Sequence, residues 1–93
     1  MRQRRERAAE VIRIEAASIA GLEEHLDAGF DAAVELVLAC QGQVILTGMG
    51  KAGLVGSKIS ATLASTGTPS FFLHPAEALH GDLGRVRGGD VVL

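Results

Sequence analysis

The sequence has 93 residues and a mass of 9.7 kDa, which allows one small domain and excludes a multi-domain enzyme within this chain. Hydrophobic residues make up 47% and charged residues 22%, and the mean hydropathy is +0.27, so neither a disordered chain nor a membrane span is expected. The formal charge of −2 leaves no basic surface for a nucleic-acid backbone. The composition therefore predicts a globular domain whose partners are neither nucleic acid nor membrane.

Cysteine content and the N-terminal residues favour the cytoplasm. The one cysteine, Cys40, cannot form an internal disulfide and falls in an apolar helical pattern, so we expect a buried thiol in a reducing compartment. Arginines near the N-terminus are interrupted by Glu6 and Glu10, and no apolar stretch of a signal peptide follows them.

The first 42 residues predict a pair of helices. Apolar residues recur at helical spacing over residues 4–28, with charged residues on the opposite face, which predicts an amphipathic helix. Gly29 is expected to end this helix. The same spacing predicts a second helix over residues 30–41, with Asp31 placed to favour its N-terminus.

From residue 43 onward the pattern changes to short strands around one helix. Apolar runs at 43–47, 70–74 and 90–93 predict strands, and residues 51–65 predict a helix with one slim side that allows close approach to a sheet. This order predicts an α/β fold, a three-layer, Rossmann-like domain with a parallel sheet, preceded by two helices. Because the chain stops inside the third strand, we expect a truncated domain that is poorly stable and inactive alone.

Six residues between the first strand and its helix predict an anion site: Gly48, Met49, Gly50, Lys51, Ala52 and Gly53. Backbone N–H groups and the positive end of the helix dipole meet at this turn. A side chain at either of the first two glycines would block the close approach of a ligand. The alternative is an ordinary tight turn between a strand and a helix.

Two nucleotide-binding motifs can be tested against this spacing. A Walker A site needs a lysine followed by serine or threonine after the second framing glycine, but Gly53 is followed by Leu54 and Val55, so it is excluded. The spacing does fit G-x-G-x-x-G, yet a dinucleotide site also needs an acidic residue near the end of the second strand, where the sequence has His74. A dinucleotide-binding domain therefore stays the weaker alternative.

Four segments in order resemble the sugar isomerase (SIS) domain of arabinose-5-phosphate isomerases: TGMGKAG at 47–53, ASTGTP at 64–69, FLHP at 72–75 and HGDLG at 80–84. The resemblance divides the chain into an N-terminal helical pair, 1–42, and the first part of a SIS domain, 43–93. It implies interconversion of ribulose 5-phosphate and arabinose 5-phosphate, which leads to the octulosonate sugar of lipopolysaccharide. It also implies a homotetramer, with paired CBS domains following in full-length members.

The resemblance implies a role for each candidate residue. Lys51 would be the catalytic lysine, neutralising the oxyanion that develops as an enediol forms; the alternative is a solvated surface lysine. His74 and His80 would lie in the substrate pocket and hydrogen-bond sugar hydroxyls or carry a proton; the alternative is a capping or strand-end hydrogen bond. The remaining implied substrate contacts are Gly48, Gly50, Gly67 and Thr68, although turn chemistry explains the last two almost as well.

The resemblance also makes His74 the implied ligand of a bound zinc ion. Two histidines without a cysteine cluster are too few for a zinc site on their own, so we expect no required cofactor and at most an incidental zinc. The loop that grips the phosphate and the residues for proton transfer are expected beyond Leu93. The main alternative function is a non-catalytic SIS module that binds a sugar phosphate for a regulator.

Overall fold

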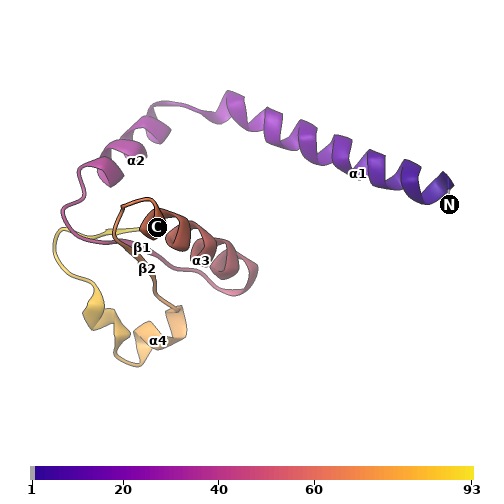
Figure 1. Ribbon diagram of the computed structural model, residues 1–93. Coiled ribbons are helices and arrows are strands. Elements are labelled where there is room, and N and C mark those ends of the chain that lie inside the picture. Colours follow the sequence, from indigo (N-terminus) through magenta and orange to yellow (C-terminus); the bar gives the residue numbers. More distant parts are fainter. Residues whose placement is uncertain (1) are drawn as a thin grey trace. The chain divides into compact units, whose positions relative to one another are not determined.

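A three-stranded parallel sheet is the centre of the second half of the chain. In a computed structural model that describes residues 2–93, its strands are β1 (Val44–Leu46), β2 (Ser70–Phe72) and β3 (Val91–Val92), in the order β2-β1-β3 (Figure 1). All three predicted strands are present, each shorter than its apolar run. The α/β class and the parallel sheet are confirmed.

The centre of this sheet is also the core of the described residues. Val44 and Ile45 are fully buried, and Leu46 and Leu73 are nearly so. The central strand pairs with both neighbours, Val44 lying opposite Ser70 on one side and opposite Val91 on the other. A strand with neighbours on both edges reads as a continuous apolar run, which explains why the sequence predicted it well.

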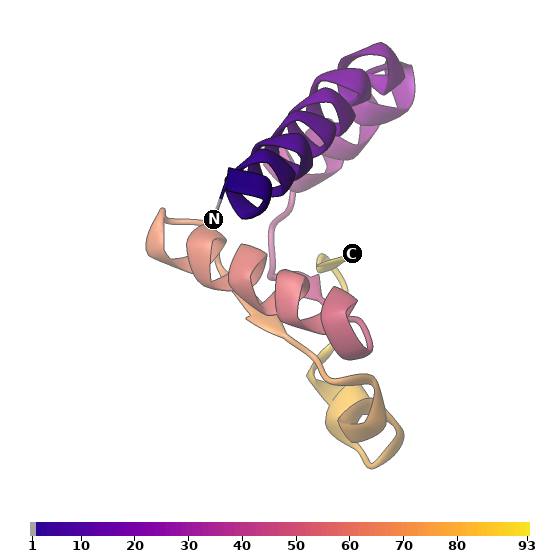
Figure 2. The ribbon, with the colours of Figure 1, turned by 90° about the vertical axis from the view of Figure 1, so that its right-hand side faces the viewer.

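Helix α3 (Gly50–Ser65) connects β1 to β2 and packs on the sheet through its small residues (Figure 2). Gly53, Gly56 and Ser60 are its buried positions. A Cβ at Gly53 would lie 2.5 Å from the Gly48 carbonyl oxygen, so only glycine fits there. The predicted slim side of this helix is therefore the side that meets the sheet.

Two short helices, which the sequence analysis did not predict, follow β2. They are α4 (Pro75–Leu79) and the 3₁₀ helix η2 (Asp82–Arg85), which pack against each other. Proline at the first helical position and Glu77 in the first turn are ordinary start signals for a helix, so α4 was recognisable. The Arg85 guanidinium lies 4.1 Å from the centre of the Phe71 ring, which links η2 to β2.

β3 is attached to β1 by side-chain as well as backbone hydrogen bonds. The Asp90 carboxylate accepts a 2.7 Å hydrogen bond from the N–H of Gln43 and another of 2.7 Å from the N–H of Arg87. These two hydrogen bonds lower the pKa of Asp90 below its ordinary value. Cys40 is half-buried rather than buried, with its thiol 3.3 Å from the carbonyl oxygen of Gly89.

The first helix ends earlier than the sequence predicted. α1 spans Arg2–Gly21, the 3₁₀ helix η1 follows at Leu22–His25, and α2 spans Ala28–Leu38. Gly29 therefore lies inside α2 and does not end α1. The reason is Asp27, whose carboxylate accepts a hydrogen bond from the N–H of Phe30 and so fixes the start of the second helix.

The chain forms two compact units that divide between Ala33 and Val34. The first contains α1, η1 and the start of α2, and none of these elements has a buried residue. The second contains the sheet. Within residues 2–93 no helix is both long enough and apolar enough to span a membrane.

Candidate active site

The glycine turn after β1 leaves the first amides of α3 facing outward. Met49 precedes the helix in an extended conformation and gives it no side-chain cap, so its first-turn N–H groups are not satisfied by a side chain of their own turn. Gly50 has φ of +57°, which favours glycine at this position. The positive end of the helix dipole is therefore available to an anion.

A depression of about 570 Å³ lies over this turn at the carboxyl ends of β1 and β2. It brings together four of the predicted residues: Gly48, Gly50, Lys51 and His74. Ligands of open parallel sheets bind at this edge because loops and helix N-termini converge there. Lys51 is exposed, and among residues 2–93 it forms no ion pair, so its ammonium group is available to the depression.

Ser57 and Phe72 also line the depression, and the sequence analysis gave neither a role in the site. Ser57 lies nearly two turns after Lys51 on α3 and is half-buried. Its hydroxyl can donate to or accept from a ligand oxygen. Its spacing from Lys51 on the predicted helix was the available signal.

The two ends of the strands that form this edge are tied together. The Thr47 hydroxyl donates a 2.5 Å hydrogen bond to the carbonyl oxygen of Leu73. The N–H of Leu73 in turn donates to the carbonyl oxygen of Leu46 at 2.8 Å. Both backbone polar groups of Leu73, the residue before His74, are therefore hydrogen-bonded to Leu46 and Thr47 at the end of β1.

His74 caps α4 and projects from the end of β2. Its Nδ1 accepts a 3.1 Å hydrogen bond from the N–H of Ala76, and its ring meets Phe72 edge to face at 6.4 Å between centroids. A neutral imidazole has one lone pair, so an Nδ1 that accepts leaves the proton on Nε2. His74 thus has a structural role and retains one donor for a ligand.

This hydrogen bond conflicts with zinc binding. Zinc takes the lone pair of a neutral imidazole, which here is used by the N–H of Ala76. Within the described residues no group of three histidine, cysteine, aspartate or glutamate side chains is placed to hold a metal. The implied role of His74 as a zinc ligand therefore stays a prediction that the donor set does not favour.

His80, Gly67 and Thr68 do not line the depression. His80 is exposed at the C-terminal end of α4, where its backbone N–H donates to Glu77. Gly67 and Thr68 follow the C-terminus of α3 and precede β2, at the opposite edge of the sheet. α3 has 16 residues, which separates its two ends by about 24 Å. Their substrate contacts remain predictions.

These features define an α/β domain of the anion-binding kind. Its parallel sheet has a glycine turn, a free lysine and a helix N-terminus at the carboxyl edge. The SIS domain family model matches residues 37–93. The chain belongs to the SIS domain family, and the resemblance drawn from its four sequence motifs is confirmed.

Curated relatives carry the name arabinose 5-phosphate isomerase. The KpsF protein of Escherichia coli is 55% identical over 80 residues, which cover 85% of this chain and 24% of that protein. The KdsD protein of Yersinia pestis is 49% identical over 84 residues, which cover 90% of this chain and 26% of that protein. The chain thus spans about a quarter of the length of these relatives.

Solved structures show the same fold. An Escherichia coli protein in complex with arabinose 5-phosphate superposes with a TM-score of 0.71 at 41% identity, over 90% of this chain and 48% of that one. A Bacteroides fragilis protein, described as a candidate phosphosugar isomerase involved in capsule formation, gives a TM-score of 0.75 at 36% identity, over 91% of this chain and 47% of that one.

Proposed function

We propose that the protein containing these 93 residues interconverts ribulose 5-phosphate and arabinose 5-phosphate. The observation that carries the proposal is the common location of Gly48, Gly50, Lys51 and His74 around one depression at the carboxyl edge of the sheet. The names of the relatives and the sugar-phosphate complex of a structural neighbour support the same substrate class.

In this reaction a proton leaves C1 of the ketose and is returned to C2, while the O2 carbonyl becomes a hydroxyl and the O1 hydroxyl becomes the aldehyde. Negative charge develops on O2 as the enediolate forms. The Lys51 ammonium would stabilise this charge, because it is a free cation beside outward-facing amides of a helix N-terminus. His74 would orient a sugar hydroxyl by donating from Nε2.

The other site residues extend this assignment. The backbone at Gly48 and Gly50 lets the sugar approach the amides closely, and His80 would hydrogen-bond a further hydroxyl once the substrate is bound. The protein is proposed to work in the cytoplasm as a homo-oligomer, without a required metal. A cytoplasmic location fits the free thiol of Cys40, which hydrogen-bonds to backbone carbonyls.

The decisive experiment compares isomerisation of ribulose 5-phosphate by the complete protein and by its Lys51→Ala variant. Loss of one preorganised charge at the developing oxyanion should lower kcat/KM by about 10²–10³-fold. Arg13→Ala is a suitable control, because this exposed cation lies on α1, outside the sheet unit that holds the site.

Absence of turnover in the wild-type protein, combined with tight binding of a sugar phosphate, would identify a regulatory binding module instead. Turnover that survives the Lys51→Ala change undiminished would remove the lysine from the mechanism.

A further inference from the structure

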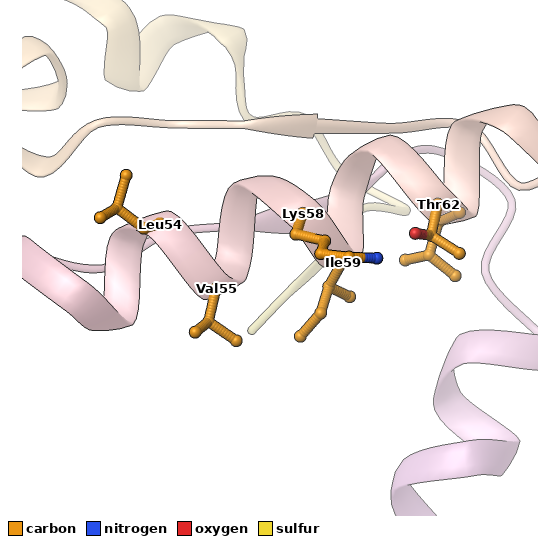
Figure 3. Close-up of a pocket in the computed structure, with 6 residues that line it drawn as sticks. Leu54, Val55, Lys58, Ile59 and Thr62 are labelled. Carbon is orange, nitrogen blue, oxygen red and sulfur yellow. The ribbon is translucent and has the colours of Figure 1, made fainter. Parts of the chain in front are cut away.

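The side of α3 that faces the sheet is built from small residues, so an aromatic ring of β2 lies directly against the helix. Val55 and Ile59 extend away from the neighbouring strand (Figure 3). Gly53 and Gly56 are buried on the other side, and the Phe72 ring covers them. A Cβ on Gly53 would lie 3.3 Å from Cζ of this ring, and one on Gly56 would lie 3.5 Å from its Cε2. Packing this close leaves the ring few alternative orientations.

Phe72 and His74 project from the same face of the chain at the end of β2. Side chains two residues apart share a face of an extended chain, and His74 is still extended, with φ of −67° and ψ of 129°. Their rings meet edge to face, with centroids 6.4 Å apart and planes at 82°. Phe71 takes the opposite face, where the Arg85 guanidinium lies 4.1 Å from its ring centre. Phe72 is therefore the aromatic neighbour that supports the imidazole from the side of α3.

Two contacts restrain the His74 ring. The N–H of Ala76 donates to its Nδ1 at 3.1 Å, which leaves the proton of the neutral ring on Nε2. His74 is exposed, so water can replace this hydrogen bond when the ring turns. Phe72 occupies the space beside the imidazole and opposes such a turn.

We propose that Phe72 is a positioning residue for His74, which keeps the imidazole on the Ala76 amide so that the Nε2–H faces the depression. Both rings line that depression together with Lys51. Phe72 has no polar side-chain atom, so its effect on a polar ligand is exerted through the orientation of His74. The use of this orientation in isomerisation rests on the proposed function, whereas the orientation itself does not.

The orientation can be measured without turnover. In the complete protein, labelled with ¹⁵N in its histidines, the imidazole signals of His74 at about pH 9, where the ring is neutral, should report a single Nε2–H tautomer. The His74→Asn variant identifies these signals by their loss. Phe72→Leu should shift them to a mixture of both tautomers, because leucine is apolar but supplies no ring. Phe71→Leu is the matched control, since it removes a ring from the opposite face and should keep the single tautomer.

Kinetics test whether the orientation serves the reaction. Phe72→Leu should lower kcat/KM for ribulose 5-phosphate about tenfold, because the donor is no longer held in place, and Phe71→Leu should leave it unchanged. In the His74→Asn background, Phe72→Leu should have almost no further effect, because the donor that it positions is already absent. An aromatic residue with a merely structural role would reduce activity equally in both backgrounds.

Circular dichroism checks that each variant folds. Phe72→Met, which fills the space without a ring, replaces Phe72→Leu if that variant does not fold, and the wild-type spectrum is decisive without either. Both tautomers in the wild-type protein, a single tautomer in the ring-deleted variant, or equal losses of activity in both backgrounds would overturn the proposal. A single tautomer in a wild-type protein without turnover, lost in the ring-deleted variant, would support the positioning and contradict the proposed function.

Discussion

Backbone amides have a side-chain partner at one edge of the sheet and none at the other. At the amino edge, the Asp90 carboxylate binds the N–H groups of Gln43 and Arg87, so the chain supplies its own anion. At the carboxyl edge, the first amides of α3 have no side-chain cap and a lysine stands beside them. Backbone donors that a protein does not satisfy itself are available to a ligand, and this contrast supports the carboxyl edge as the candidate binding edge.

The largest effect is expected at the carboxyl edge, where the glycine turn touches its own helix. Gly53→Ala would place a Cβ 2.5 Å from the Gly48 carbonyl oxygen, and the shift needed should lower the free energy of unfolding by about 2–3 kcal/mol. Gly56→Ala is the matched control. Its Cβ would make ordinary contacts from 3.5 Å, and a gain of about 0.5–1 kcal/mol is expected from helix propensity.

Chemical denaturation of both variants measures the difference. Equal stabilities for the two variants would mean that the turn and the helix do not meet as closely as described.

The next effect is a pH dependence at the amino edge. Hydrogen bonds from the N–H groups of Gln43 and Arg87 lower the pKa of Asp90 below 3.8 in the folded chain. Its contribution to stability is therefore complete above that pH and is lost as the pH falls through the lowered pKa. Thermal unfolding of the wild-type chain should show this acid-dependent loss.

Asp90→Asn should have a lower Tm at pH 7 and a smaller change in Tm between pH 5 and pH 2. An unchanged acid transition in this variant would mean that the carboxylate does not hold β3 against β1.

A smaller effect separates the two roles of His74. His74→Ala removes the Nδ1 acceptor for the N–H of Ala76 and should lower the free energy of unfolding by about 1 kcal/mol. His74→Asn keeps a capping acceptor and should restore that stability. Because asparagine lacks the ring Nε2, isomerisation by the complete protein should fall in both variants if the donor contacts the sugar.

Full activity in His74→Asn would restrict this residue to its capping role. Calorimetric titration with zinc should show no tight binding by the wild-type chain, because binding would have to displace the cap.

The sequence predicted the parts of the fold that local patterns determine. The runs around β1, β2 and β3 are apolar and bounded by glycine or proline, and α3 has a slim side, so the parallel α/β order followed from composition and spacing. The end of α1 was predicted wrongly. Helical spacing continues through residues 22–26, but the side-chain cap at Asp27 starts a new helix, and such a cap outweighs a continuing apolar period.

Sequence patterns also predicted part of the candidate site. Gly48, Gly50 and Lys51 belong to one local motif, and His74 ends the predicted strand at 70–74, so the rule that ligands bind at the carboxyl ends of parallel strands brings them together. Ser57 was missed as a site residue because its relation to the depression depends on how α3 is rotated over the sheet. The positions of Gly67 and Thr68 follow from the parallel register, which puts the turn before β2 at the opposite edge.

The hydrogen bond from Thr47 to the Leu73 carbonyl has a consequence for selectivity. Because this hydrogen bond joins the two strand ends, the distance between the glycine turn and the imidazole of His74 is set by the backbone and can change little. Lys51, with its flexible four-carbon stem, is the longest flexible side chain among the described residues that line the depression. If the complete protein isomerises sugar phosphates as proposed, it should discriminate their chain lengths mainly by how far the Lys51 side chain must bend. A shorter cationic side chain at position 51 should then narrow the range of substrates accepted.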